Sequence, residues 1–130
     1  MRGADVKATT VLVSAALALS ACSKATPPTW TSVSAPGAER AVYLDTANIL
    51  VNAGVIYVTL QTRTSGDAPD AGGRPFGLVH AEADCRQHLL EPTALKEEQY
   101  GADGRRTGMR LVAITGPETD DVLARACKGR

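Results

Sequence analysis

The chain is short, balanced in charge and poor in aromatic side chains. Its 130 residues include 14 basic and 14 acidic side chains, and only 4% are Phe, Trp or Tyr. This length accommodates one domain with a modest core. Because there is no excess of positive charge, we expect neither a nucleic-acid-binding surface nor electrostatic attachment to an anionic membrane.

Residues 1–21 have the organisation of an export signal. Arg2 and Lys7 make the start of the chain positive, and the following run of about 14 residues, 8–21, is apolar and uncharged. A helix needs about 20 apolar residues to cross a bilayer core. The segment is therefore predicted to be a cleaved signal peptide rather than a permanent transmembrane anchor.

Leu19–Cys22, with the sequence LSAC, resembles the lipobox of bacterial lipoproteins. The resemblance implies that Cys22 receives lipid, palmitate among its acyl chains, and becomes the first mature residue, bound to the lipid bilayer. Ser23 stands where an aspartate commonly retains such lipoproteins in the inner membrane. We therefore expect a cell-envelope protein of the outer membrane. The alternative is that Cys22 is simply a small residue at the end of an ordinary signal peptide.

The cysteine count supports an exported domain. Removing 21 of the 130 residues leaves 109, and the loss of Arg2, Lys7 and Asp5 leaves 12 basic and 13 acidic side chains. If Cys22 carries lipid, the remaining pair is Cys85 and Cys127, for which an oxidising compartment favours a disulfide. A loop of about 42 residues closed in this way stabilises a domain by about 4 kcal/mol. Two buried free thiols are the alternative.

The first half of the mature chain predicts a tether and two strands. Residues 22–29 have no apolar periodicity, so we expect a short tether, with the packed domain beginning at Trp30. Residues 40–45 predict a strand. In residues 55–63 apolar and polar side chains alternate, which is typical of a strand with one buried face. Residues 64–75, rich in Gly, Pro and Asp, predict a mobile hairpin loop.

The second half predicts further strands and a helix. Residues 79–89 alternate again, with Cys85 on the apolar face and His80 to His88 on the polar one. Residues 93–106 predict another strand followed by a turn at 101–104, and residues 108–114 predict a further apolar strand. From Thr115 or Gly116 the period changes to that of a helix, which places Cys127 on its apolar face. The predicted fold is α+β: a small antiparallel sheet with a C-terminal helix attached by a disulfide.

Several short motifs resemble the surface-adhesin E-like family of bacterial lipoproteins. They are Trp30, VYLDTANI at 42–49, EADCRQHLL at 82–90, QYGADG at 99–104 and the last cysteine, Cys127. Residues 30–130 are thus similar to that domain, although TGPETDD replaces the Pro-Gly pair that usually precedes the family's helix. The resemblance implies an antiparallel sheet, a terminal helix and a Cys85–Cys127 disulfide. Named members of that family are outer-membrane surface proteins that bind host matrix components, so the resemblance also implies such a role for this chain.

No set of residues predicts catalysis or a cofactor. In one extended strand, His80 and His88 would lie roughly 26 Å apart, too far to bind one metal ion, and His80, Glu82 and Asp84 are too widely spaced for a shared ligand shell. No nucleophile motif or phosphate loop is present. We therefore expect a non-enzymatic module that binds a protein partner at the cell surface. The alternative is a periplasm-facing structural or assembly lipoprotein.

Overall fold

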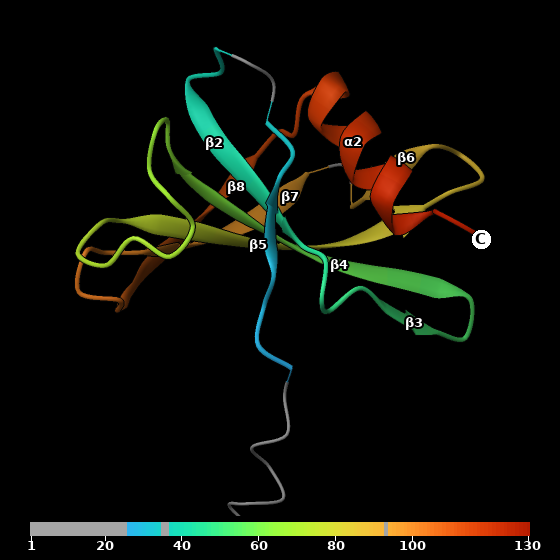
Figure 1. Ribbon diagram of the computed structural model, residues 1–130, viewed down its shortest axis with the longest axis horizontal. Coiled ribbons are helices and arrows are strands. Elements are labelled where there is room, and N and C mark those ends of the chain that lie inside the picture. Colours follow the sequence, from blue (N-terminus) through green and yellow to red (C-terminus); the bar gives the residue numbers. More distant parts are fainter. Residues whose placement is uncertain (1–25, 35–36, 93) are drawn as a thin grey trace, which may run out of the picture.

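The computed structural model describes residues 26–34, 37–92 and 94–130. Within these residues, eight strands form one antiparallel sheet, and one helix follows them (Figure 1). The strands are β1 (Trp30–Ser32), β2 (Arg40–Asp45), β3 (Leu50–Asn52), β4 (Val55–Thr64), β5 (Phe76–Asp84), β6 (Leu89–Glu91), β7 (Leu95–Tyr100) and β8 (Arg106–Val112), and the helix is α2 (Gly116–Ala126).

The sheet is organised around two long central strands. β4 and β5 pair along most of their length, and the main order is β1-β2-β4-β5-β7-β8. The short β3 lies beyond the end of β2 along the same edge of β4, since β2 pairs with residues 60–64 and β3 with residues 55–57. In the same way β6 and β7 share one edge of β5. The predicted antiparallel sheet is confirmed, but with eight strands it is not small.

One face of the sheet carries the core. Because side chains alternate along a strand, the register places every second residue of β2, β4 and β5 on the face covered by α2. The helix contributes its own apolar stripe at i, i+1 and i+4 to this layer. The buried apolar side chains are Val33, Val42, Leu44, Ile56, Val58, Leu60, Val79, Ala81, Ala83, Leu90, Leu95, Val122, Leu123 and Ala126.

The helix begins where the sequence predicted it. Thr115 is the N-cap, and its side chain accepts a hydrogen bond from the Glu118 amide while the Glu118 carboxylate accepts one from the Thr115 amide. This reciprocal capping box satisfies two amides that would otherwise have no partner. Within the described ranges, no helix combines the length and the apolar character required to span a bilayer.

The expectation of one continuous strand through residues 79–89 is wrong. β5 ends at Asp84, whose carboxylate accepts a hydrogen bond from the Gln87 amide at 2.9 Å, and the chain turns over residues 85–88. His88 completes the turn with a positive φ of 56°. β6 then runs back along β5, pairing Leu89 with Asp84. Alternation alone could not reveal the turn. Leu89 is separated from the apolar residues Val79, Ala81 and Ala83 by an even number of positions, so it fits the same alternating pattern with or without a turn.

The 64–75 loop is a hairpin connection, as predicted, but it is anchored at several points. The Tyr43 hydroxyl donates to the carbonyl of Asp67 at 2.7 Å. The buried Arg63 donates to the carbonyls of Ala71 and Pro69 at 2.8 and 2.9 Å. None of residues 64–75 is buried, so composition gave no sign that the preceding strand holds the loop in place.

Candidate binding site

A polar groove of about 430 Å³ opens beside the core at the β4–β5 hairpin end of the sheet. The register puts Thr62, Gly77, Glu97 and Arg110 side by side on the same face as the apolar core. The groove is thus a polar continuation of the buried layer. Its lining residues are Glu39, Arg40, Thr62, Arg63, Thr64, Pro75, Phe76, Gly77, Glu97, Gln99, Tyr100, Gly101, Thr107 and Arg110.

Glu97 is the central charge of this groove. Its side chain is only 2% exposed, its Oε1 accepts a hydrogen bond from Arg110 Nε at 2.7 Å, and its Oε2 accepts one from the Thr62 hydroxyl. Gly77 lies directly against it, because a Cβ there would come within 2.6 Å of the Glu97 Cδ. The missing side chain at Gly77 makes room for the buried carboxylate.

A second ion pair joins the groove to the helix. Arg40 Nη2 donates to the carbonyl of Ala113 at 2.6 Å and to the buried Glu118 Oε1 at 3.2 Å. The same Glu118 oxygen closes the capping box of α2. Glu97 and Glu118 therefore both have arginine partners, and among the described residues every buried polar side-chain atom has a hydrogen-bond partner. These groups hold the sheet and the helix together.

On the opposite face of the sheet, Arg63 begins a stack across three strands. Its guanidinium lies 4.9 Å from the centre of the Phe76 ring, which stacks on Tyr100 at 4.9 Å with an interplanar angle of 7°. The register aligns these three residues on neighbouring strands β4, β5 and β7. Arg63 Nε also donates to Gln61 Oε1 at 2.8 Å. The arrangement fixes the base of the 64–75 loop.

The histidines of the polar face lie apart, but each meets a carboxylate. His80 Nε2 lies 3.3 Å from Glu98 Oε1, whereas His88 Nε2 lies 2.7 Å from Asp120 Oδ1 on the helix. The turn at 85–88 therefore carries His88 to α2, a neighbour that the extended-strand interpretation could not foresee. No group of three or more metal-ligating side chains occurs within residues 26–34, 37–92 and 94–130.

Strand β8 offers a different kind of surface. It ends the main strand order and pairs with β7, so its other side carries backbone groups that no strand of the described sheet pairs with. Its Met109 and Leu111 side chains are 48% and 66% exposed. Arg110 points to the opposite face, where it meets Glu97. An edge strand with free backbone groups and exposed apolar side chains can accept a further extended strand.

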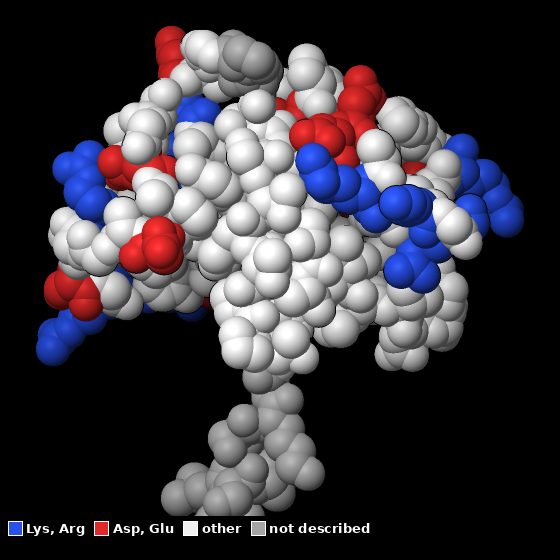
Figure 2. All heavy atoms as spheres, in the orientation of Figure 1, with Lys and Arg blue, Asp and Glu red and all other residues white. Residues whose placement is uncertain are grey.

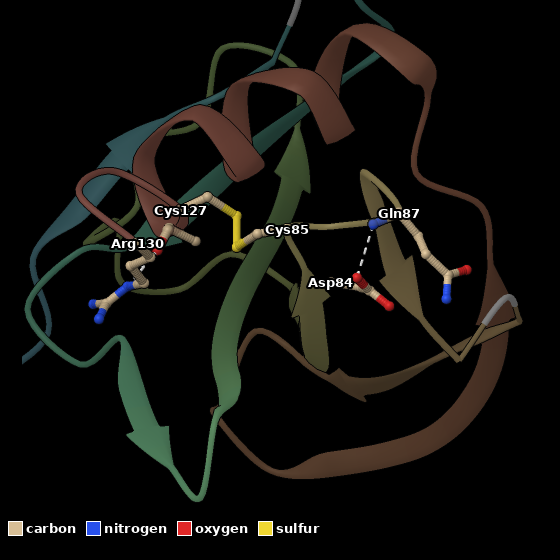
Figure 3. Close-up of a disulfide and its surroundings, with 6 residues drawn as sticks. Asp84, Cys85, Gln87, Cys127 and Arg130 are labelled. Carbon is tan, nitrogen blue, oxygen red and sulfur yellow. Dashed lines mark hydrogen bonds between the residues drawn. A yellow bond between two sulfur atoms is a disulfide. The ribbon is translucent and has the colours of Figure 1, made fainter.

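The predicted site residues have different outcomes. Cys22, the expected lipidation site, lies outside the described residues, as does the whole signal segment 1–21. Cys85 and Cys127 form the expected disulfide, with Cα atoms 5.7 Å apart (Figure 3). The bond connects the turn after β5 to the end of α2, and both cysteines pack against the core.

The sequence interpretation missed the two buried carboxylates that pair with arginines, Glu97 in the groove and Glu118 on the helix. A signal for one of them was present, because alternation in residues 95–100 places Glu97 on the same face as Leu95. A carboxylate on the apolar side of a strand predicts a buried partner. The identity of that partner, Arg110, depends on the pairing of β7 with β8 and is not a local property of either strand.

No family model, no curated protein and no solved structure matches the chain in sequence or fold comparisons.

Proposed function

We propose that this protein is a membrane-anchored bacterial lipoprotein that acts as a non-enzymatic, adhesin-like protein-binding module at the cell surface. The order of residues from Arg2 to Cys22 supports the lipid anchor. The observation that carries the binding role is the exposed edge strand β8. A partner segment would add to the sheet by main-chain hydrogen bonds, which require no catalytic group.

The edge strand also suggests the character of the partner segment. Met109 and Leu111 offer apolar contacts on one face, and on the other face Arg110 keeps 59% of its side chain exposed while its Nε is paired with Glu97. Arg106 at the start of the strand is 49% exposed. Both arginines already have a carboxylate partner, Glu97 for Arg110 and Glu98 for Arg106, so we expect an extended segment that is selected mainly by its apolar side chains.

The 64–75 loop is a weaker candidate contact. Three of its carbonyl groups, those of Asp67, Pro69 and Ala71, already accept hydrogen bonds from Tyr43 or Arg63. A loop whose backbone acceptors are occupied has fewer groups to offer to another chain. The free edge of β8 is favoured over the loop for this reason.

The second candidate function is a periplasm-facing structural or assembly lipoprotein. One observation favours it: the chain is already held to the domain at Thr26, whose carbonyl accepts a hydrogen bond from Asn48 Nδ2 at 3.0 Å. Only residues 22–25 then separate the expected lipid from the folded domain. A domain held so close to a bilayer reaches partners in that membrane more easily than distant ones.

Site-specific photo-crosslinking tests the edge strand. A benzophenone amino acid at position 111 should crosslink to a protein partner on intact cells, whereas the same probe at Leu50 of β3, which has a similar exposure, should not. Leu111→Lys should abolish capture of that partner by the purified protein, because the charge opposes apolar pairing. Protease treatment of intact cells separates the two candidates, since a periplasm-facing domain is protected. Crosslinks from position 68 in the loop and none from position 111 would contradict the edge assignment.

A further inference from the structure

The β3–β4 hairpin is an uncharged projection of the domain. No Asp, Glu, Lys or Arg occurs in the 17 residues from 46 to 62. Within this stretch Leu50, Val51 and Tyr57 are 60%, 49% and 40% exposed. The strands are joined by a two-residue turn, Ala53 and Gly54, both with positive φ, as tight hairpins require. Figure 1 shows the hairpin extending away from the helix-covered body.

The N-terminal end of the described chain is held beside this hairpin. The Thr29 amide donates to Asp45 Oδ1 at 3.0 Å, and the Thr46 amide donates to the Thr29 carbonyl at 2.9 Å. Asn48, two residues before β3, holds the Thr26 carbonyl. Figure 1 shows this end and the hairpin on the same, lower side of the molecule. In Figure 2 the described surface around this N-terminal end is white, without acidic or basic side chains. Charged side chains lie to either side of it.

Chain length limits how far this side can lie from the expected lipid. Cys22 precedes Thr26 by four residues, and an extended chain spans at most about 3.5 Å per residue. The acylated cysteine therefore lies within about 14 Å of Thr26. Because Thr26 is bound beside β3, this reach brings the apolar hairpin close to the bilayer surface. This step rests on the proposed lipoprotein anchor.

We propose that the β3–β4 hairpin is a membrane-contacting element, which places Leu50, Val51 and Tyr57 in the interfacial region of the bilayer that holds the lipid anchor. An amphipathic tyrosine suits the headgroup level, and neighbouring leucine and valine side chains suit the acyl boundary. Residues 46–62 carry no charge that would have to lose its hydration, and Glu82, which lies opposite Tyr57 on β5, has to stay at the hydrated headgroup level. The contact is apolar, so it should not depend on anionic lipids or on salt.

Membrane contact by the hairpin would set the orientation of the whole domain. β4 has ten residues and therefore spans about 33 Å from the hairpin turn to the 64–75 loop. The hairpin lies at one end of this strand, and the polar groove and the loop lie at the other. The loop end would face away from the membrane, and the β8 edge would stand at the side of the domain.

The test uses the full acylated protein in vesicles of phosphatidylethanolamine and phosphatidylglycerol that contain brominated acyl chains. Trp30, the single tryptophan, is replaced by Phe, and a new tryptophan is introduced as Leu50→Trp or, in the matched control, Leu111→Trp. We expect several-fold stronger quenching of the position 50 probe than of the position 111 probe. The ratio should persist in vesicles without phosphatidylglycerol and at high salt.

A second measurement needs no substitution near the hairpin. Amide hydrogen exchange of the unaltered acylated protein should be several-fold slower at residues 50–57 in vesicles than in the water-soluble Cys22→Ala variant, with residues 106–112 unchanged. Equal weak quenching at positions 50 and 111, in protein that floats with the vesicles, would overturn the hairpin contact alone. A crosslink from position 50 to a protein in cells would also overturn it. Failure to float would overturn both the anchor and the inference that depends on it.

Discussion

Three buried carboxylates, Asp45, Glu97 and Glu118, connect parts of this chain that are distant in sequence. Asp45 accepts hydrogen bonds from Thr29, Ala47 and Asn48 and so joins the N-terminal segment to the β2–β3 corner. The other two join β7 to β8 and β2 to α2. Because a buried carboxylate without partners is costly, each of them specifies one arrangement of its neighbours.

Asp45→Ala tests the N-terminal corner. The substitution leaves the amides of Thr29 and Ala47 without their acceptor, so we expect a loss of about 2–3 kcal/mol in the free energy of unfolding. Amide exchange at residues 26–30 should also become faster. Urea unfolding and hydrogen exchange measure the two effects, and Asp70→Ala, at an exposed loop position, should change neither. Equal losses in the two variants would show that the corner does not depend on the Asp45 carboxylate.

Arg63→Met tests the anchoring of the 64–75 loop. The guanidinium of Arg63 donates to Gln61 and to two loop carbonyls, and the residue is only 7% exposed. Methionine keeps the contact with the Phe76 ring but donates no hydrogen bond, so stability should fall by about 2–4 kcal/mol. Arg74→Met removes a surface pair with Asp67 and should cost less than about 1 kcal/mol. Denaturant unfolding of both variants measures the two losses in stability. Equal losses would show that the burial of Arg63 does not make its hydrogen bonds more important.

At the scale of elements, sequence patterns predicted β4 and the helix well but extended β5 beyond its end at Asp84. β4 alternates over enough residues to show a period of two, and α2 has both a capping box and an apolar stripe. The strands β1, β3 and β6 have three residues each, too few for a period to be seen. They form because each pairs with the edge of a longer strand, β1 with β2, β3 with β4 and β6 with β5. That information lies in the pairing and not in the short segment itself.

The candidate site was less predictable than the fold for a similar reason. From the sequence, the contact could be proposed only as some edge of the sheet, because strand order decides which strands, here β1 and β8, end the main sheet. The groove required four strands to bring Thr62, Gly77, Glu97 and Arg110 together. The disulfide was predictable from three observations. The strand period placed Cys85 on an apolar face, the helix period did the same for Cys127, and these two cysteines remained once Cys22 was assigned to lipid.

The disulfide should contribute much of the attachment of α2. Cys85→Ser with Cys127→Ser removes a link across 42 residues, and we expect the free energy of unfolding to fall by about 2–5 kcal/mol. Thermal unfolding followed with and without reductant measures this. Reductant should lower the melting temperature of the parent protein and leave the double variant unchanged. A parent protein insensitive to reductant, even after unfolding and refolding in its presence, would contradict this role.

At the scale of the whole molecule, the two ends of β4 have opposite character. The β3–β4 hairpin at one end carries exposed Leu50, Val51 and Tyr57 and no charge of its own, although Glu82 of β5 lies opposite Tyr57. The other end carries the groove with its paired arginines and carboxylates. The N-terminal segment leaves from the uncharged end. Lipid attachment at Cys22 would thus be consistent with an apolar side facing the bilayer and a polar side facing water.

Cys22→Ala tests the anchor on which this orientation depends. Stable membrane attachment requires at least two acyl chains, since one chain binds only marginally, and an alanine accepts neither. The variant should therefore move from the detergent phase to the aqueous phase in detergent-phase partitioning. The Cys85→Ser, Cys127→Ser variant is the matched control, because it loses two thiols but should still partition with detergent. Hairpin insertion alone buries three side chains and should not hold the Cys22→Ala variant on vesicles through repeated washing. A Cys22→Ala protein that remains as firmly membrane-bound as the parent would show that some other part of the chain is the anchor.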